Sequence, residues 1–139
     1  MRSINLIVIH CSATRCDRPY PVKRLIADHE NRFGFTWYHY YITRDGHIYQ
    51  TRHENLVSAH ARGYNQHSIG VCYEGGLNEL EHPADTRTTQ QKAALWHLLK
   101  SLKTDHPDAR ILGHCELPHV QKTCPNFLAS KEYAELNGD

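Results

Sequence analysis

This sequence lacks a large excess of either positive or negative charge. Sixteen lysine and arginine residues stand against fifteen aspartate and glutamate residues, which leaves a formal net charge of +1. Proteins that bind nucleic acids or anionic membranes usually present a strongly basic face, because their partners are polyanions. The composition therefore predicts a protein that binds neither nucleic acid nor a charged membrane surface.

Long apolar runs are also missing. A membrane-spanning helix needs about 20 consecutive apolar residues, and no segment approaches that length. The apolar run Leu6–Ile9 is too short for the hydrophobic region of a signal peptide, and it ends in His10. We therefore expect no membrane insertion and no export signal, so that the protein is synthesised in the cytoplasm.

Internal repeats, low-complexity tracts and linkers are absent as well. The 139 residues have the usual length of one domain and suffice to bury a core. We therefore expect a single domain, residues 1–139, and a monomer.

The cysteines do not form the pattern of a disulfide framework. There are five of them, an odd number, at uneven spacings. Histidine, in contrast, is unusually frequent, with 12 residues. Most of these histidines are expected on the surface or in the core, but their number invites a search for metal ligands.

Hydrophobic periodicity predicts strands and helices in one mixed arrangement. The hairpin expected around the turn Arg44-Asp45-Gly46-His47 needs antiparallel pairing, whereas strands joined by crossover connections pair in parallel. We therefore predict an α/β fold: a single domain with a central mixed β-sheet flanked by helices. The predicted strands are 4–9, 37–43, 48–49, 68–73 and 110–112, and the predicted helices are 22–33, 88–102 and 127–136.

Two histidines and one cysteine are the candidate metal ligands. His10 ends the first strand, His114 follows the strand at 110–112, and Cys124 lies in a loop further on. Imidazole and thiolate suit zinc, and three protein ligands leave the fourth position open, as in catalytic sites. Taken singly, each residue is more often a buried or hydrogen-bonded core side chain, and no CxxC or HExxH spacing is present.

The other thiols compete with Cys124 for this role. Cys11 and Cys115 each follow a candidate histidine directly, so on an extended strand their side chains would point to the opposite face. Cys72 lies within an apolar strand and is expected in the core, whereas the pattern does not assign Cys16.

Five motifs resemble, in order and spacing, those of the zinc-dependent N-acetylmuramoyl-L-alanine amidases of the phage T7 lysozyme type. The same family includes the peptidoglycan recognition proteins and the muropeptide amidases of cell-wall recycling. The resemblance runs from about Ile4 to Phe127. The motifs are His10-Cys11-Ser12-Ala13-Thr14, Tyr38-His39-Tyr40 before Arg44-Asp45-Gly46, His60-Ala61-Arg62-Gly63-Tyr64-Asn65, Ser68-Ile69-Gly70-Val71, and Gly113-His114 through Lys122-Thr123-Cys124-Pro125.

The resemblance implies a zinc hydrolase that cleaves the amide bond between N-acetylmuramic acid and L-alanine. Its substrate would be peptidoglycan or a muropeptide, and its cofactor Zn2+. Carried over by position, the zinc ligands are His10, His114 and Cys124, the catalytic residues are Tyr38 and Lys122, and His60 lines the substrate groove.

Several roles within this mechanism follow from position. Lys122 lies two residues from Cys124, so we expect its ammonium to reach the developing oxyanion. Tyr38 either donates a hydrogen bond to the same charge or orients the attacking water. His60 either protonates the leaving amine or contacts the glycan, and Glu116 is expected to orient a ligand histidine rather than to shuttle a proton.

The walls of the groove are expected to be polar and aromatic. Tyr38 and Tyr40 alternate with their neighbours along the predicted strand, so we expect this tyrosine pair on one face. The candidate wall residues are Trp37, Tyr40, Tyr64 and Asn65.

Three other interpretations use the same residues. A recognition module would bind muropeptides without cutting them, but the presence of Cys124, Tyr38 and Lys122 favours an enzyme. A regulatory protein would bind RNA polymerase, but the segment before His10 is shorter than that pattern requires. A purely structural zinc would need four good ligands rather than three. Both the cell wall, after release, and cytoplasmic muropeptides fit as the place of action.

Overall fold

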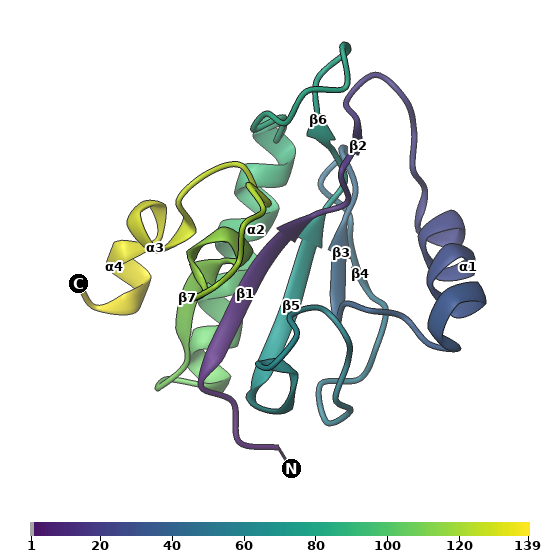
Figure 1. Cartoon of the computed structure of the whole chain (residues 1–139). Coiled ribbons are helices and arrows are strands. Elements are labelled where there is room, and N and C mark those ends of the chain that lie inside the picture. Colours follow the sequence, from purple (N-terminus) through teal and green to yellow (C-terminus); the bar gives the residue numbers. More distant parts are fainter. Residues whose placement is uncertain (1) are drawn as a thin grey trace.

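A five-stranded mixed sheet forms the centre of the computed structural model, which describes residues 2–139 (Figure 1). The strand order is β4-β3-β5-β1-β7. Every neighbouring pair is parallel except β3 and β4, which form the predicted antiparallel hairpin. The strands are β1 (Leu6–Cys11), β3 (Tyr40–Ile42), β4 (Ile48–Gln50), β5 (Ser68–Tyr73) and β7 (Arg110–Gly113).

The helices cover both faces of this sheet. The longest, α2, lies behind the sheet in Figure 1, whereas α1 lies at its other side. The helices are α1 (Val22–Phe33), α2 (Thr89–Asp105), α3 (Ala129–Glu132) and α4 (Ala134–Asn137), with single turns η1 (Asn65–His67) and η2 (His114–Glu116). The predicted α/β architecture is confirmed. No helix among residues 2–139 is long and apolar enough to cross a bilayer.

The alternation of side chains along β1 decides which face receives the candidate ligand. Ile7 and Ile9 belong to the apolar cluster that includes the leucines of α2. Val8 packs on the opposite face, against Ala61 and Leu117. Because successive side chains of a strand point to opposite faces, His10 lies on the same face as Val8. The site therefore lies across the sheet from α2.

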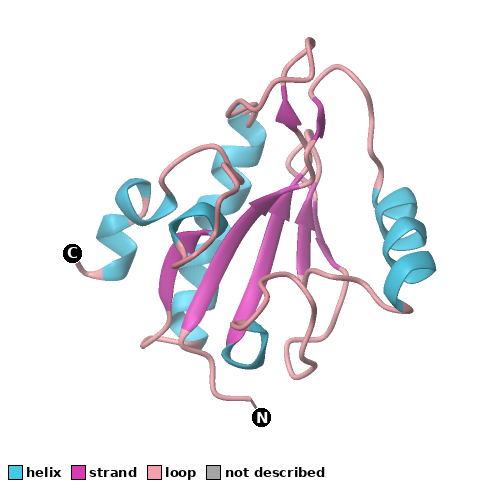
Figure 2. Ribbon diagram, in the orientation of Figure 1, coloured by secondary structure: helices cyan, strands magenta, loops and turns pink. Residues whose placement is uncertain are grey.

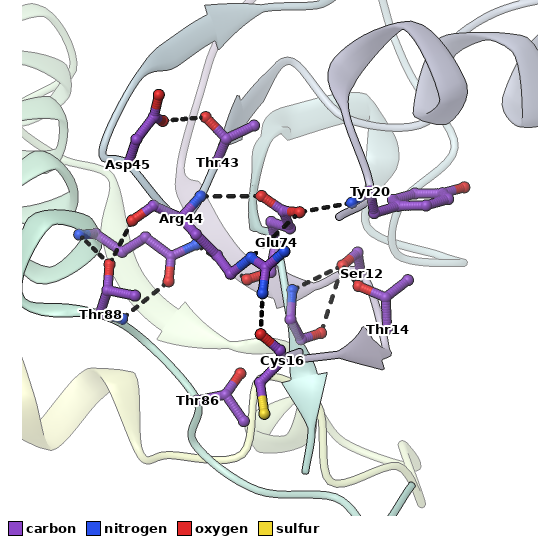
Figure 3. Close-up of polar contacts among 12 residues, drawn as sticks. Ser12, Thr14, Cys16, Tyr20, Thr43, Arg44, Asp45, Glu74, Thr86 and Thr88 are labelled. Atoms are coloured by element: carbon purple, nitrogen blue, oxygen red, sulfur yellow. Dashed lines mark hydrogen bonds and ion pairs between the residues drawn. The ribbon is translucent and has the colours of Figure 1, made fainter. Parts of the chain in front are cut away.

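A buried carboxylate fixes the chain beyond the carboxyl end of β1 (Figure 3). Glu74 is 4% exposed, and it accepts hydrogen bonds from the backbone N–H groups of Tyr20 at 2.6 Å and Arg44 at 2.9 Å. Nearby, the Ser12 hydroxyl accepts the Gly75 N–H at 2.9 Å. Figure 2 shows the two short strands β2 (Thr14–Arg15) and β6 (Gly76–Leu77) continuing from these contacts. The turn that follows His10 is thus held by side-chain hydrogen bonds as well as by backbone pairing.

Capping groups confirm the predicted end of α1 and the predicted start of α2, whereas α2 continues to Asp105, beyond the predicted end at 102. Gly34 ends α1 at a φ of 78°, a left-handed conformation that glycine adopts without strain. Thr88 and Gln91 form the predicted capping box at the start of α2. The predicted helix 127–136 is instead two short helices, because the backbone leaves the helical conformation at Tyr133, where φ is −105° and ψ is 25°.

The strand predicted at 37–43 is shorter than expected. The N–H of Gly70 donates to the ring nitrogen Nδ1 of His39 at 3.1 Å, in place of a backbone carbonyl. The ladder between β3 and β5 consequently begins at Tyr40, and Trp37, Tyr38 and His39 lie in the preceding loop.

Candidate metal centre and groove

The three predicted ligands meet at one point. The ligand atoms of His10, His114 and Cys124 all lie within 4.8 Å of one another, and the two imidazole centroids are 4.6 Å apart. The convergence follows from topology, because β1 and β7 are parallel neighbours whose carboxyl ends meet at the same edge. His10 lies near the end of β1, and His114 directly follows β7.

Cys124 reaches this point from a loop that backbone hydrogen bonds hold in place. The N–H of Cys11 donates to the Cys124 sulfur at 3.1 Å, and the N–H of Cys115 donates to the Cys124 carbonyl at 2.8 Å. The hydrogen-bonded Cys11 thiol and burial raise the pKa of the Cys124 thiol in the metal-free protein. A metal ion bound here would displace that proton, since only the thiolate is a ligand.

The two histidines are held in the neutral form that a metal requires. Burial, followed by the charges of His60, His114 and Lys122, lowers the pKa of His10 well below its ordinary value. Burial and the charge of Lys122 also lower the pKa of His114. Two neutral imidazoles and one cysteine form a donor set that fits zinc and leaves its fourth position open. Among residues 2–139 this is the one group of three or more His, Cys, Asp or Glu side chains arranged to hold a metal.

The other thiols do not join the ligand group. Cys72 is fully buried in the core, as predicted. The Cys11 sulfur lies against Gly76, where an added Cβ would be 2.4 Å away. All five cysteines are free, which agrees with the absence of a disulfide pattern.

Tyr38 lies beside the first ligand. It is 8% exposed, and its ring centroid is 5.0 Å from that of His10. Burial raises the pKa of Tyr38 well above its ordinary value, so the phenol keeps its proton and remains a hydrogen-bond donor. The expectation that Tyr38 and Tyr40 share a face is wrong, because Tyr38 precedes the strand. Tyr40 packs against the apolar cluster of α2 and donates its hydroxyl proton to Glu54.

Lys122 is exposed at the edge of the site. It lines the cavity that contains the ligand histidine His114, and its charge acts on both ligand histidines. Among residues 2–139, no group forms a hydrogen bond or an ion pair with its ammonium. Its ammonium is therefore available to a bound substrate.

His60 faces the site from the segment before β5. It is 7% exposed and is one of the residues that line the groove. Its Nδ1 lies 2.9 Å from Nε2 of His10, and its Nε2 lies 2.8 Å from the Ser68 hydroxyl. Neither hydrogen bond has a signal in the sequence, because both depend on how the segment before β5 folds back against β5 and β1.

Glu116 does not contact a ligand side chain. Its Oε1 accepts the N–H groups of Gly113 and Ser130, each at 3.1 Å, and its Oε2 accepts the hydroxyl of Ser130. The expectation that Glu116 orients a ligand histidine through its side chain is therefore wrong. The carboxylate instead fixes the backbone turn from which His114 projects.

An open groove runs past these groups. A cavity of about 770 Å³ borders the site, and a second of about 870 Å³ shares Asn65 with it. Tyr64 and Asn65 line the groove as expected, whereas Trp37 stacks on His29 with centroids 4.1 Å apart and lines neither cavity. The lining of the first cavity contains no carboxylate; it comprises Phe33, Ala59, His60, Arg62, Asn65, His114, Pro118, His119, Val120, Gln121 and Lys122.

The arrangement is typical of single-metal hydrolases that act on extended polar substrates. It combines an open three-ligand centre with a phenol donor and a free ammonium on one side of an α/β sheet.

Comparison with known proteins identifies the family. The model of the family N-acetylmuramoyl-L-alanine amidase matches residues 1–127. The endolysin of Escherichia phage T7 is 34% identical over 126 residues, which cover 90% of this chain and 82% of the endolysin. The chain therefore belongs to the N-acetylmuramoyl-L-alanine amidase family, as its motifs predict.

Solved structures agree with this assignment. LysC, an N-acetylmuramoyl-L-alanine amidase from Clostridium intestinale, matches with a TM-score of 0.80 and 30% identity, over 98% of this chain and 87% of that chain. PGRP-SA of Apis mellifera shares the fold, with a TM-score of 0.75 and 20% identity, over 96% of this chain and 83% of that chain.

Proposed function

We propose that this protein is a zinc-dependent amidase that hydrolyses the bond between N-acetylmuramic acid and L-alanine in peptidoglycan or muropeptides. The observation that supports this most directly is the convergence of His10, His114 and Cys124 within 4.8 Å, beside Tyr38 and an open groove. Because every group comes from one chain, a monomer suffices. As with the phage endolysins that it resembles, the cell wall is the proposed place of action.

His10, His114 and Cys124 would hold the zinc ion. A zinc ion bound there would supply a water with a pKa of about 7 and a Lewis acid for the scissile carbonyl. The protein's own contribution is to keep both ligand histidines neutral, so that their nitrogens are available to the metal.

Tyr38 and Lys122 act on the charge that develops on the carbonyl oxygen. The phenol of Tyr38 stays protonated, so it donates a hydrogen bond without first losing its proton. The ammonium of Lys122 adds a positive charge from the solvent-exposed edge of the site. Donors that are positioned before the reaction stabilise an oxyanion more strongly than water, which must reorganise.

The charge of the groove suits an anionic substrate. Its lining beside the site contains two permanent cations, Arg62 and Lys122, and no carboxylate. Peptidoglycan stem peptides contain free carboxylates, which a groove of this sign attracts and a groove of opposite sign would repel.

The test joins metal content to activity. The purified protein is assayed for zinc and then incubated with peptidoglycan and with a soluble muramyl peptide, with and without a chelator. Mass spectrometry detects the free stem peptide that begins at L-alanine. About one zinc per chain together with chelator-sensitive release of this peptide is the expected result. Zinc without release would indicate a recognition module, and neither zinc nor release would refute the ligand assignment.

A further inference from the structure

A buried chain of three side chains lies behind the first metal ligand. Nε2 of His10 is 2.9 Å from Nδ1 of His60, and Nε2 of His60 is 2.8 Å from the hydroxyl oxygen of Ser68. His10 lies on β1 and Ser68 on β5, and these two strands are parallel neighbours. The chain therefore spans the gap between two strands of the central sheet.

The protons along this chain have one order that is compatible with metal binding. A neutral imidazole has one N–H donor and one nitrogen acceptor. If His10 donates from Nε2 to His60 Nδ1, then His60 donates from Nε2 to Ser68, and His10 Nδ1 keeps its lone pair. The reverse order would place the proton on His10 Nδ1 and leave no free nitrogen for a metal.

We propose that His60 and Ser68 are positioning residues that fix the tautomer and ring orientation of His10 for the metal. This inference depends on the metal site of the proposed function. Ligand histidines usually donate their second N–H to a group behind them, and that group strengthens metal binding. His60 is this group, and Ser68 in turn fixes the tautomer of His60. In this proposal His60 supports metal binding through His10 and has no role in binding the substrate.

The surroundings of His60 are shaped to hold its ring. His60 is 7% exposed and Ser68 is fully buried, so water does not compete strongly for their hydrogen bonds. A Cβ at Gly70 would lie 2.6 Å from the His60 ring, so only glycine leaves room for it. The Asn65 side chain accepts the backbone N–H of His60 at 3.0 Å. Arg2 also donates to the Ser68 carbonyl at 3.1 Å.

The group that accepts the hydrogen bond from His10 differs from the usual one. The group behind a ligand histidine is commonly a carboxylate or a carbonyl oxygen. Here it is a second imidazole, a group that has no negatively charged form in a protein and that accepts from His10 through a ring nitrogen. The support therefore orients His10 without adding negative charge, and a bound metal would keep its full power to polarise a carbonyl.

Zinc affinity tests the inference, because a substrate-binding role would leave it unchanged. The dissociation constant for zinc is measured by competition with a chelating dye in the full-length protein. His60→Ala is expected to weaken zinc binding by about 10- to 100-fold. Ser68→Ala is expected to weaken it less, and to have no further effect when His60→Ala is already present. His60→Asn, whose side-chain oxygen replaces the Nδ1 acceptor, is expected to recover most of the affinity.

His119→Ala is the matched control. His119 lines the same cavity and is exposed, and it donates or accepts no side-chain hydrogen bond among residues 2–139. Its replacement is expected to leave zinc affinity unchanged. Unchanged zinc affinity in His60→Ala, whether or not KM for a muramyl peptide rises, would overturn the proposal. If the unaltered protein binds no zinc, the proposed function itself fails, which is a separate outcome.

Nitrogen NMR gives a test that needs no substitution. In the zinc-loaded protein, the imidazole signals of His60 should show a protonated Nε2 and a bare Nδ1. Those of His10 should show a protonated Nε2 and a metal-bound Nδ1. A His60 ring protonated on Nδ1 would contradict the proposed order of hydrogen bonds.

Discussion

Acid should destabilise this protein through histidines that the fold keeps neutral. Burial lowers the pKa of His29 to about 4 and that of His39 to about 4. Both side chains are almost inaccessible, with exposed fractions of 5% and 0%. In the unfolded chain the pKa of a histidine returns to about 6.5. Between the folded pKa and the unfolded pKa, these histidines are protonated in the unfolded chain but remain neutral in the folded protein.

The direction and size of the effect follow from this difference. Stability is fully present above pH 6.5 and is lost as the pH falls toward 4, because protons then favour the unfolded chain. At pH 5 each of the two histidines lowers the free energy of unfolding by about 2 kcal/mol relative to neutral pH. Together they remove about 4 kcal/mol, a large part of the 5–15 kcal/mol that typically stabilises a domain.

Urea unfolding at pH 7 and pH 5 measures this loss, with a chelator present so that no metal contributes. In His29→Asn and His39→Asn the side-chain oxygen can replace the Nδ1 that accepts from Trp37 or from Gly70. Each variant should lose about 2 kcal/mol less than the unaltered protein over this range. His82→Asn, at an exposed position, should show the unaltered pH dependence. If the free energy of unfolding of the unaltered protein fell by less than about 1 kcal/mol between pH 7 and pH 5, buried neutral histidines would not explain its acid sensitivity. Equal losses in all variants would exclude His29 and His39 as the cause.

Further predictions concern the site. Tyr38→Phe removes a buried donor and should lower kcat by about 100- to 1000-fold with zinc content unchanged; full turnover would show that the phenol has no catalytic role. Lys122→Ala should lower kcat in the same assay and also retain zinc, and loss of the metal would instead reveal a structural role. Arg62→Met should raise KM by about 10-fold or more for muramyl peptides with free stem carboxylates; an equal rise with amidated stems would exclude carboxylate binding. Gly70→Ala should displace the His60 ring and weaken zinc binding in a dye-competition titration, and unaltered affinity would contradict the tight packing described there.

The parts of the fold that local patterns specify could be predicted from the sequence. Apolar β-branched runs identified β1 and β5, and capping residues identified the end of α1 and the start of α2. The ligand pair His10 and His114 could be anticipated because each follows or ends a strand of the same parallel set. Local patterns left the choice among five thiols open, and only the family motif singled out Cys124, whose sulfur the structure places near His10 and His114.

The remaining contacts depend on tertiary packing and have no local signal. The side chain of His39 replaces a backbone acceptor, so that β3 begins only at Tyr40, and Tyr38 and Tyr40 pack on different faces. Glu116 caps the backbone of Gly113 instead of reaching a ligand. The bond between His10 and His60 joins positions that only the pairing of two strands brings together.

The ligands also differ in how firmly the fold holds them. His10 belongs to β1, which has a parallel neighbour on each side, whereas Cys124 belongs to a surface loop near the C-terminal helices. A metal bound by both would act as a cross-link from position 10 to position 124, which closes most of the chain into one loop. Hydrogen exchange should therefore be slowed by zinc mainly in the loop 114–126, with little change in β1. In this protein the metal would therefore have two roles: it would take part in catalysis, and it would stabilise the loop 114–126.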